Sequence, residues 1–347
     1  MSVEESEPLK TVQSGLVKIV AEIGVNHNGS VELAKELVSR SAAAGADYAK
    51  FQTFKAVDVA SERAALANYQ QKVAKGSRQV DMLSALELSE ADFQQLVDFC
   101  AEVGVGFLTT AHDLQSARFV LGLASDYVKV ASGDITNYPL LRLFSQQGTP
   151  VLLSTGASEA DEVLRAITVL ESGGLERSQI TVMQCTSEYP APVSEANLRA
   201  MAVMGTEWGV PVGYSDHTQG INASIAAVAM GATVIEKHIT LERTMDGPDH
   251  AASLEPREFE QMVKGIRDVS AAMGSDSKRV VASEQSNRSL IRKSIVATVP
   301  IVAGDTFSEE NLGVMRPGDG VSPMLWESVL GQKASRDFVA QEAITLQ

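Results

Sequence analysis

The chain has 347 residues, of which 44% are hydrophobic and 21% are charged, so it is long enough for one large domain or for a large and a small one. It has no run near the roughly 18 apolar residues that a membrane helix needs, and its acidic start is unlike a signal or transit peptide. A formal charge of −15 argues against nucleic acid or an anionic membrane as a partner. The two distant cysteines, Cys100 and Cys185, indicate a reducing compartment, so we expect a cytoplasmic protein.

Eight short runs of β-branched and apolar residues follow one another along the chain. They cover residues 17–25, 47–54, 105–111, 126–132, 150–156, 180–186, 210–216 and 232–240. Helical patterns such as 30–46 and 222–232 lie between them, and Gly45, Gly104 and Gly231 suit left-handed helix ends. The alternation predicts a (β/α)8 TIM barrel. A doubly wound open sheet is the alternative, but no G-x-G-x-x-G motif follows the first strand.

Two segments interrupt the alternation, and residues 291–347 continue beyond it with short strand signals and turns. Residues 55–90 are a long excursion after the second strand, of the kind that forms active-site lids or oligomer contacts. Residues 274–290 are polar and rich in turn formers, which is typical of a linker. We therefore predict a barrel domain over 1–273, a linker over 274–290 and a small second domain over 291–347.

Two lysines lie inside predicted strands, where burying a charged side chain is unfavourable unless it is paired. Lys50 and Gln52 share one face of the second strand, and Lys129 lies in the fourth. A buried ammonium group loses its hydration, so we interpret both lysines as inward-pointing ligands for an anion. The alternative is a structural salt bridge with Glu22 or Asp134.

His217 and His238 end the seventh and eighth predicted strands, which are neighbours in a barrel. Either one alone is typical of a hydrogen-bonded loop residue. Together with Glu22 or Asp249 on the same rim, they predict a divalent metal site with open positions for substrate and water. A third ligand candidate is His27. The remaining histidines, His112 and His250, are expected at the edge of the site.

Small hydroxyl residues follow several other strands, in the segments 132–134 (SGD), 154–156 (STG) and 185–187 (CTS). Their hydroxyl and backbone N–H groups, with the two lysines, can hold a phosphate or carboxylate. The sequence has no Ser-His-Asp order, G-x-S-x-G elbow, P-loop or C-x-x-C motif. Covalent hydrolysis and nucleoside triphosphate chemistry are therefore disfavoured.

Longer segments carry a resemblance to a known family. They are AEIGVNHNGS, KFQTF, KVASGDITNYPLL, STGAS, CTSEYPAP, GYSDHT, GATVIEKHITLERTMDGPDHAASLEP and MRPGDGVSP. Together they resemble the sialic acid synthases, which include the N-acetylneuraminate, legionaminic acid and pseudaminic acid synthases. Such enzymes have a TIM barrel followed by a small antifreeze-like (SAF) domain. The resemblance implies a domain-swapped homodimer in which the SAF domain of one subunit covers the barrel mouth of the other.

The activity implied by this resemblance is a metal-dependent condensation of phosphoenolpyruvate with the open-chain aldehyde of an N-acetylated hexosamine, releasing phosphate by C–O cleavage. We expect N-acetylneuraminate synthase activity with N-acetylmannosamine. The alternative is a legionaminic acid synthase that uses 2,4-diacetamido-2,4,6-trideoxymannose. Behind these come a pseudaminic acid synthase and a metal-dependent aldolase or isomerase. A non-catalytic carbohydrate- or ice-binding protein is disfavoured, because residues 291–347 hold few threonines.

The resemblance also implies roles for individual residues. Those matching phosphoenolpyruvate contacts are Lys50, Thr110, Lys129, Ser132, Ser154, Ser187 and Ser215. Those matching sugar contacts are Glu22, Gln52, Tyr189, Asp249 and, from the partner subunit's SAF domain, Arg316. His217 and His238 match the metal ligands, for manganese or alternatively magnesium or cobalt. Glu22 is the candidate for proton transfer and Asp249 its competitor, while Lys50 and Lys129 clamp the anion. Where TTAHD replaces the common STPF, His112 comes near the phosphate.

Overall fold

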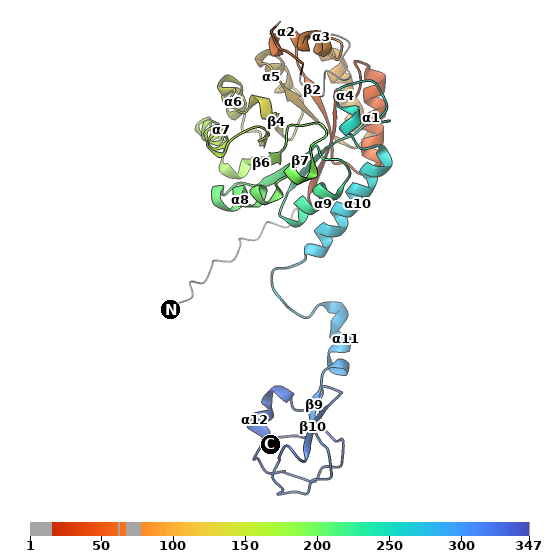
Figure 1. Ribbon diagram of the computed structural model, residues 1–347, viewed down its shortest axis with the longest axis vertical. Helices are drawn as coiled ribbons and strands as arrows, with labels where there is room; N and C mark the ends of the chain where they lie inside the picture. Colours follow the sequence, from red (N-terminus) through yellow and green to blue (C-terminus); the bar gives the residue numbers. More distant parts are fainter. Residues whose placement is uncertain (1–15, 62, 67–77, 347) are drawn as a thin grey trace. The chain divides into compact units, whose positions relative to one another are not determined.

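The chain divides into two compact units, which meet in the sequence between Gly274 and Ser275 (Figure 1). The structure is a computed structural model, and it describes residues 16–61, 63–66 and 78–346. Among these residues no helix is both long and apolar enough to cross a membrane. The predicted excursion at 55–90 lies partly outside the described residues.

Within the described residues of the first unit, eight parallel strands form a closed barrel in chain order, with β8 paired to β1. The strands are β1 Lys18–Gly24, β2 Tyr48–Thr53, β3 Gly106–Ala111, β4 Val128–Val130, β5 Val151–Ser154, β6 Ile180–Cys185, β7 Val212–Asp216 and β8 Val234–His238. The TIM barrel prediction is confirmed, and the open-sheet alternative is wrong because the sheet has no edge.

Helices follow the strands and cover the outside of the barrel (Figure 1). They are α1 Val31–Ala43, α4 Glu90–Val103, α5 Leu114–Val120, α6 Tyr138–Ser145, α7 Ala160–Ser172, α8 Leu198–Trp208, α9 Asn222–Ala229 and α10 Pro256–Met273. Local signals fix their ends. Ser89 and Asp92 form a capping box at the start of α4, and Gly104, with φ of 78°, ends it in the left-handed region. Two shorter helices, α2 Ala56–Val59 and α3 Gln79–Ser84, lie in the excursion after β2.

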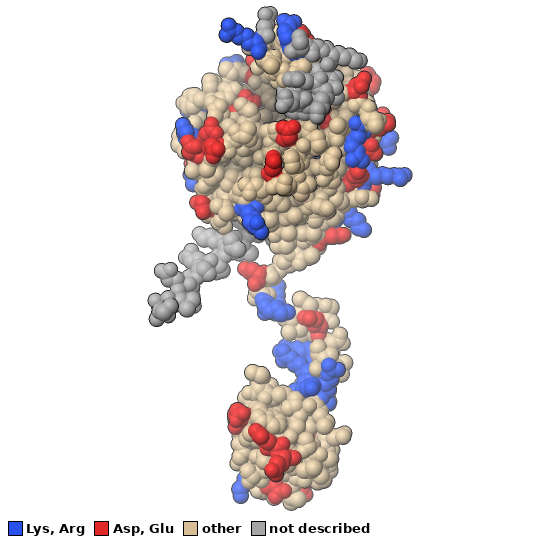
Figure 2. Space-filling view, in the orientation of Figure 1, with Lys and Arg blue, Asp and Glu red and all other residues tan. Residues whose placement is uncertain are grey.

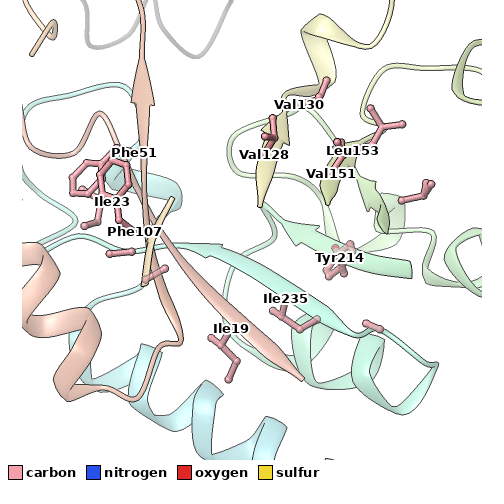
Figure 3. Close-up of a cluster of buried hydrophobic side chains, with 14 of the residues drawn as sticks. Ile19, Ile23, Phe51, Phe107, Val128, Val130, Val151, Leu153, Tyr214 and Ile235 are labelled. Atoms are coloured by element: carbon pink, nitrogen blue, oxygen red, sulfur yellow. The ribbon is translucent and has the colours of Figure 1, made fainter. Parts of the chain in front are cut away.

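The outward faces of the strands pack against the helices in the larger apolar core of this unit. Figure 3 shows part of this layer, with Ile19 and Ile23 on β1, Phe51 on β2 and Phe107 on β3. The rings of Phe51 and Phe107 are stacked, with centroids 5.8 Å apart. Since side chains alternate across a strand, the residues between these positions point into the barrel.

The inward-pointing residues change character along the strands. A first layer is apolar and consists of Val20, Tyr48, Leu108, Leu152, Met183 and Val234. Two residues further along the same strands the layer is polar, with Glu22, Lys50, Thr110, Ser154, Cys185 and Glu236. The next step gives Gln52 on β2 and His238 on β8. The polar and charged residues that point into the barrel therefore lie above an apolar layer, at the carboxyl ends of the strands.

The amino ends of the strands are closed by hydrogen-bonded polar groups. Arg267 of α10 donates to the carboxylate of Asp47 at 2.8 Å, and the same carboxylate accepts the N–H of Ile19 at 2.7 Å. Tyr48 donates its hydroxyl to Asp126 at 2.8 Å. These contacts join α10, β1, β2 and the segment before β4.

The second unit is built around a small apolar core of its own. Its described elements are α11 Ala282–Ile291, β9 Ser294–Ala297, β10 Leu312–Met315 and α12 Trp326–Val329, with β9 antiparallel to β10. The core includes Ile295, Phe307, Phe338 and Ile344. Short 3-10 helices of the two units lie at Ser132–Asp134 (η2), Arg177–Gln179 (η3), Val193–Glu195 (η4), His250–Ala252 (η5) and Pro323–Leu325 (η6).

Helix α11 occupies much of the segment expected to be a turn-rich linker, so that expectation missed a helix. The carboxylate of Glu284 accepts the N–H of Val281 and caps the start of α11. The helix is exposed all around, and its large apolar residues, Leu290 and Ile291, are adjacent at its end, so it lacks the apolar period that identifies a packed helix. Figure 2 shows basic side chains gathered along this part of the chain. The sequence from residue 278 to residue 293 contains Lys278, Arg279, Arg288, Arg292 and Lys293.

Candidate active site

The carboxyl ends of the barrel strands surround a cavity of about 450 Å³. The barrel residues to which the resemblance gave a role all line it: Glu22, Lys50, Gln52, Thr110, Lys129, Ser132, Ser154, Ser187, Tyr189, Ser215, His217, His238 and Asp249. Residues from all eight strands or the loops after them thus converge on one space. The roles given to them stay predictions, as does the role of Arg316, which belongs to the second unit.

Two buried lysines form the deep part of the cavity. Lys50 donates to Thr110 Oγ1 at 3.0 Å, and Lys129 donates to Ser154 Oγ at 2.8 Å. Ser132 begins η2 beside them, and its Oγ accepts the N–H of Gly156 at 2.9 Å. Two cations with neighbouring hydroxyl groups make a site for an anion such as a phosphate or a carboxylate.

Both lysines are also paired with buried carboxylates. Lys50 Nζ lies 2.6 Å from Glu22 Oε2 and 3.6 Å from Glu236 Oε2, while Lys129 Nζ lies 3.4 Å from Glu236 Oε1. The predicted alternative of a salt bridge between Lys50 and Glu22 is therefore present in the structure. It coexists with a position on the cavity, so it leaves the anion-ligand interpretation in place.

The two glutamates differ in how firmly their charge is held. Burial raises the pKa of Glu22 above its usual range, and the opposing effect of Lys50 does not cancel this. Burial also acts on Glu236, but Lys129 and Lys50 outweigh it and lower its pKa to about 2. For Lys50, burial lowers the pKa, yet Glu22 and Glu236 raise it above the usual value. Glu236 is thus the firmly ionised partner of both lysines.

His217 and His238 lie side by side at the cavity rim, with ring centroids 5.4 Å apart. His217 Nδ1 is 2.7 Å from the carbonyl oxygen of Thr186, so this nitrogen carries the proton and donates it. That arrangement leaves Nε2 of His217 as the nitrogen with a lone pair. Burial, then the neighbouring His217, lowers the pKa of His238 well below its usual value, which keeps its imidazole neutral.

The rim beside the histidines holds an aromatic ring and a carboxylate. The ring of Tyr189 lies 4.1 Å from that of His217, centroid to centroid. Asp249 Oδ2 lies 3.9 Å from His238 Nδ1. Burial, together with the charge of Glu22, raises the pKa of Asp249 to about 6. Asp249 is therefore able to exchange protons close to neutral pH.

A glycine allows these polar groups to approach one another. Gly24 ends β1 with φ of 56°, in the left-handed region that glycine tolerates. A Cβ at this position would lie 3.2 Å from Gln52 Nε2 and 3.2 Å from Glu22 Oε1. It would also lie 3.6 Å from Asp249 Oδ2. A side chain here would crowd the three polar groups.

One observation in particular indicates that the two histidines could bind a divalent cation. His238 Nδ1 is buried and has no hydrogen-bond partner in the described part of the chain. An unpaired buried nitrogen on a neutral ring is a ligand position, and hydrogen-bonding through Nδ1 orients His217 in the way that ligating histidines are oriented. Within the described residues no group of three or more His, Cys, Asp or Glu side chains is arranged to hold a metal. The chain would thus supply two ligands and leave the rest to substrate and water.

The remaining histidines occupy other places. His27 accepts the N–H of Gly29 on Nδ1 and contacts the ring of Phe51, and it is not part of the cavity lining. It therefore does not join His217 and His238. His250 is within hydrogen-bond distance of Thr240 Oγ1, at 2.7 Å, and also lies outside the lining.

His112 does line the cavity, where its Nδ1 lies 3.2 Å from Asp134 Oδ2. Asp134 is held in turn by Asn137, whose amide donates to Oδ1 at 3.0 Å. Asp134 thus holds the ring of His112 at the cavity, directly after β3.

Sequence reasoning missed two parts of the lining. Glu236 received no role, although strand alternation puts it on the same face of β8 as His238, one layer below and among the lysines. An apolar wall formed by Val25, Met82, Leu83 and Leu86 was missed as well. Val25 follows β1, and the other three residues come from α3 and the segment after it, where six residues of helix carry too little periodic signal to be placed from sequence.

Comparison with known proteins decides the family. A model of the NeuB family matches residues 37–278, and a model of the SAF domain matches residues 292–347. The chain belongs to the NeuB family. It is therefore an enzyme of sialic (nonulosonic) acid biosynthesis, as the resemblance implied, with a TIM barrel followed by a SAF domain.

Individual relatives of this NeuB-family enzyme differ in the sugar acid they are named for. The N,N′-diacetyllegionaminic acid synthase of Campylobacter jejuni is 43% identical over 94% of this chain and 98% of its own length. The N,N′-diacetyllegionaminic acid synthase of Legionella pneumophila is 41% identical over 93% of this chain and 91% of its own. The solved structure of an N-acetylneuraminic acid synthetase from Leptospira borgpetersenii, in complex with citrate, superposes with a TM-score of 0.70 at 29% identity, over 79% of this chain and 90% of that one.

Proposed function

We propose that the chain is an N,N′-diacetyllegionaminic acid synthase, which condenses phosphoenolpyruvate with open-chain 2,4-diacetamido-2,4,6-trideoxymannose. The observation that carries the proposal is the identity to the two legionaminic acid synthases, which exceeds the identity to the N-acetylneuraminic acid synthetase. It favours the alternative sugar over N-acetylmannosamine, which the sequence alone had put first.

The apolar wall of the cavity supports a deoxygenated sugar. Val25, Met82, Leu83 and Leu86 offer no hydrogen-bond partner through their side chains, so a hydroxyl group turned toward them would lose its bonds to water. The C6 methyl group and the second acetamido methyl group of the proposed substrate suit such a wall. Among the described lining residues, Lys50 and Lys129 are the only lysines or arginines. If both bind phosphoenolpyruvate, a sugar that carried its own phosphate group would find no further cation in the lining.

The lysines and hydroxyl groups hold phosphoenolpyruvate in this proposal. Lys50 and Lys129 supply positive charge that is already desolvated, so their attraction for a bound anion is little screened. The hydroxyl groups and backbone N–H groups orient the phosphate and carboxylate, and come from Thr110, Ser132, Ser154, Ser187 and Ser215. The reacting carbon is thereby placed below the rim where the aldehyde binds.

His217 and His238 would hold a divalent cation, for which we propose Mn²⁺, with Mg²⁺ or Co²⁺ as substitutes. When bound, the ion supplies a Lewis acid that polarises an aldehyde oxygen. The chain's own residues orient the first ring and keep the second neutral: the Thr186 carbonyl oxygen holds Nδ1 of His217, and burial disfavours protonation of His238. The ring of Tyr189 lies over His217 and excludes water from that side.

Proton transfer falls to the carboxyl groups of the rim. In the proposed reaction, C3 of phosphoenolpyruvate attacks the sugar aldehyde, water adds at C2, and the C–O bond to the phosphate breaks. The added water gives up both of its protons: one ends on the aldehyde oxygen, which becomes a hydroxyl group, and the other on the departing phosphate as the C2 carbonyl forms. Glu22 and Asp249 are the candidates, since burial raises the pKa of both carboxyl groups and brings Asp249 to about 6.

The proposal includes a homodimer in which Arg316 of the SAF domain contacts the sugar bound by the partner subunit. Arg316 is exposed, and its Nε donates to the carbonyl oxygen of Ile291 at 3.1 Å. That contact holds the start of the guanidinium group and leaves its planar end for a carbonyl such as that of an acetamido group.

The proposed function is tested by phosphate release from phosphoenolpyruvate with Mn²⁺ and one of two sugars. We expect kcat/KM to be higher with 2,4-diacetamido-2,4,6-trideoxymannose than with N-acetylmannosamine. Equal or greater kcat/KM with N-acetylmannosamine would contradict the assignment. Cleavage of either sugar without phosphate release would point instead to an aldolase.

A further inference from the structure

Four buried charges face one another under the cavity, and we call them the charge quartet: Glu22, Lys50, Lys129 and Glu236. Each side chain is at most 5% exposed. Lys50 bridges the two carboxylates, and Glu236 bridges the two lysines. The quartet is formally neutral, so both cations are already neutralised before any ligand is present.

This neutrality conflicts with the proposed binding of an anion at Lys50. Glu22 Oε2 lies 2.6 Å from Lys50 Nζ, the distance of a direct contact, and both groups are removed from solvent. Phosphoenolpyruvate carries a phosphate and a carboxylate. A second anion beside the same ammonium group would be repelled by Glu22, and this repulsion is little screened at a buried site.

The two glutamates are not equally able to give way. Glu236 is held by Lys50, by Lys129 and by the hydroxyl of Ser215, which donates to Oε1 at 3.0 Å. The short contact of Glu22 is with Lys50, and Gln52 donates to its other oxygen at 3.2 Å. The Gln52 amide lies near Gly24 and Asp249, one layer above the lysines. Because residue 24 is a glycine, no side chain fills the space beside this amide. Glu22 therefore has a hydrogen-bond donor in the direction away from Lys50.

We propose that Glu22 is an internal anion that occupies Lys50 in the free enzyme and is displaced when phosphoenolpyruvate binds. The substrate anion replaces the carboxylate at Lys50, and the Glu22 carboxyl group turns toward Gln52 and the sugar end of the cavity. Glu236 stays in place and keeps the two lysines at their spacing. The inference rests on the proposed function, because it takes Lys50 as the ligand of phosphoenolpyruvate.

The proposal predicts that removing the charge of Glu22 tightens the binding of phosphoenolpyruvate. In Glu22→Gln, phosphoenolpyruvate no longer competes with a carboxylate for Lys50, so we expect its Kd to fall by roughly tenfold or more. If Glu22 only transferred protons, its replacement would leave this Kd unchanged. The measurement is calorimetric titration of the full-length protein with phosphoenolpyruvate and no sugar. Inorganic phosphate serves as a second probe and is expected to shift in the same direction.

A matched control is available at another lysine–glutamate pair of the barrel. Lys55 and Glu87 are 3.6 Å apart and lie outside the cavity lining. Glu87→Gln makes the same change of charge on the same unit, and we expect the Kd for phosphoenolpyruvate to stay within about twofold of the wild-type value. A tightening equal to that of Glu22→Gln would overturn the proposal, because it would show a general charge effect.

Stability gives a second readout. Glu22→Gln leaves the buried Lys50 with Glu236 as its remaining charged partner, so we expect a lower Tm than wild type without ligand and a larger rise of Tm with phosphoenolpyruvate. If Glu22→Gln does not fold, Glu22→Asp retains the charge but shortens the reach to Lys50. We expect a smaller fall in Kd there.

The outcomes separate the inference from the proposed function. If wild type binds phosphoenolpyruvate and neither Glu22 variant binds it more tightly, the displacement is overturned while the proposed function stands. If wild type binds it and the variants bind it more tightly, yet no sugar is converted, the displacement stands and the proposed function fails. Wild-type protein that does not bind phosphoenolpyruvate overturns both.

Discussion

The two ends of the barrel use buried polar groups in opposite ways. At the amino ends, Asp47 accepts hydrogen bonds from both Arg267 and Ile19, and Tyr48 is bonded to Asp126. At the carboxyl ends, His238 Nδ1 is buried without a hydrogen-bond partner among the described residues. One end satisfies its polar groups within the chain, and the other leaves polar groups for a ligand.

Residues that stabilise the fold and residues that line the cavity are therefore only a few positions apart on each strand. On β2, Tyr48 belongs to the apolar layer, Lys50 to the charged layer and Gln52 to the rim. A buried polar group without a hydrogen-bond partner lowers the free energy of unfolding. Such groups are therefore expected mainly where they bind a ligand. Changes at the carboxyl ends should therefore alter turnover more than stability, and changes at the amino ends should do the reverse.

The largest expected effect is at the metal-ligand candidates of the mouth. His217→Ala and His238→Ala should each lower metal-dependent kcat by about a thousandfold, equivalent to roughly 4 kcal/mol of lost transition-state stabilisation. Both variants should keep the circular dichroism spectrum of the wild type. His250→Gln, in the neighbouring loop but outside the cavity lining, is the control and should retain metal-dependent turnover. Wild-type turnover in both alanine variants would refute the metal assignment.

The mouth should also be the acid-sensitive end. Burial lowers the pKa of His27 to about 4, from 6.5 in the unfolded chain. The unfolded chain therefore binds more protons in this window, and the free energy of unfolding should fall by about 3 kcal/mol from this group as the pH drops from 6.5 to 4. The measurement is urea unfolding at several pH values. In His27→Asn, which can still accept the Gly29 N–H, the dependence should weaken; an unchanged dependence would exclude His27 as its source.

A change at the amino ends should affect stability alone. Arg267→Met removes the partner of Asp47 and should lower the free energy of unfolding by about 2 kcal/mol. Arg165→Met, at an exposed pair with Asp161, is the control and should lower it by less than about 0.5 kcal/mol. Both are measured by urea unfolding. A fall of kcat in Arg267→Met that exceeds its loss of folded protein would break the distinction between the two ends.

Arg316 tests whether the mouth is completed by a second subunit. Arg316→Ala should raise KM for the sugar by roughly tenfold through loss of a charge-assisted hydrogen bond, with little change for phosphoenolpyruvate. Mixing it with His217→Ala should restore part of the activity, because one site of a heterodimer then has both residues. No recovery in verified heterodimers would argue against a shared site.

The smallest effect is expected at the apolar wall. Leu83→Gln offers a polar partner to a hydroxyl group and should reduce the preference for the deoxygenated sugar over N-acetylmannosamine by about fivefold in kcat/KM. Val57→Gln makes a similar change at an exposed site in the same excursion and should leave the ratio unchanged. If both variants give the wild-type ratio, the wall does not select the sugar.

Much of the barrel could be predicted because its signals are local. Alternation placed Lys50 and Gln52 on one face of the second strand, and the order of strands brought His217 beside His238. The pairing of Lys50 with both Glu22 and Glu236 could not be chosen from sequence, since it depends on side-chain reach across strands that are distant in the chain. Helix α11 escaped prediction because it has no apolar face to give a period.

The central claim is that the mouth joins phosphoenolpyruvate to a diacetamido sugar with cleavage of the C–O bond. The most direct measurement uses phosphoenolpyruvate labelled with oxygen-18 at the bridging position, together with Mn²⁺ and 2,4-diacetamido-2,4,6-trideoxymannose. Mass spectrometry of the products should show a nine-carbon keto acid without label and phosphate that retains it. Label in the keto acid, or no condensation product from this sugar, would contradict the account.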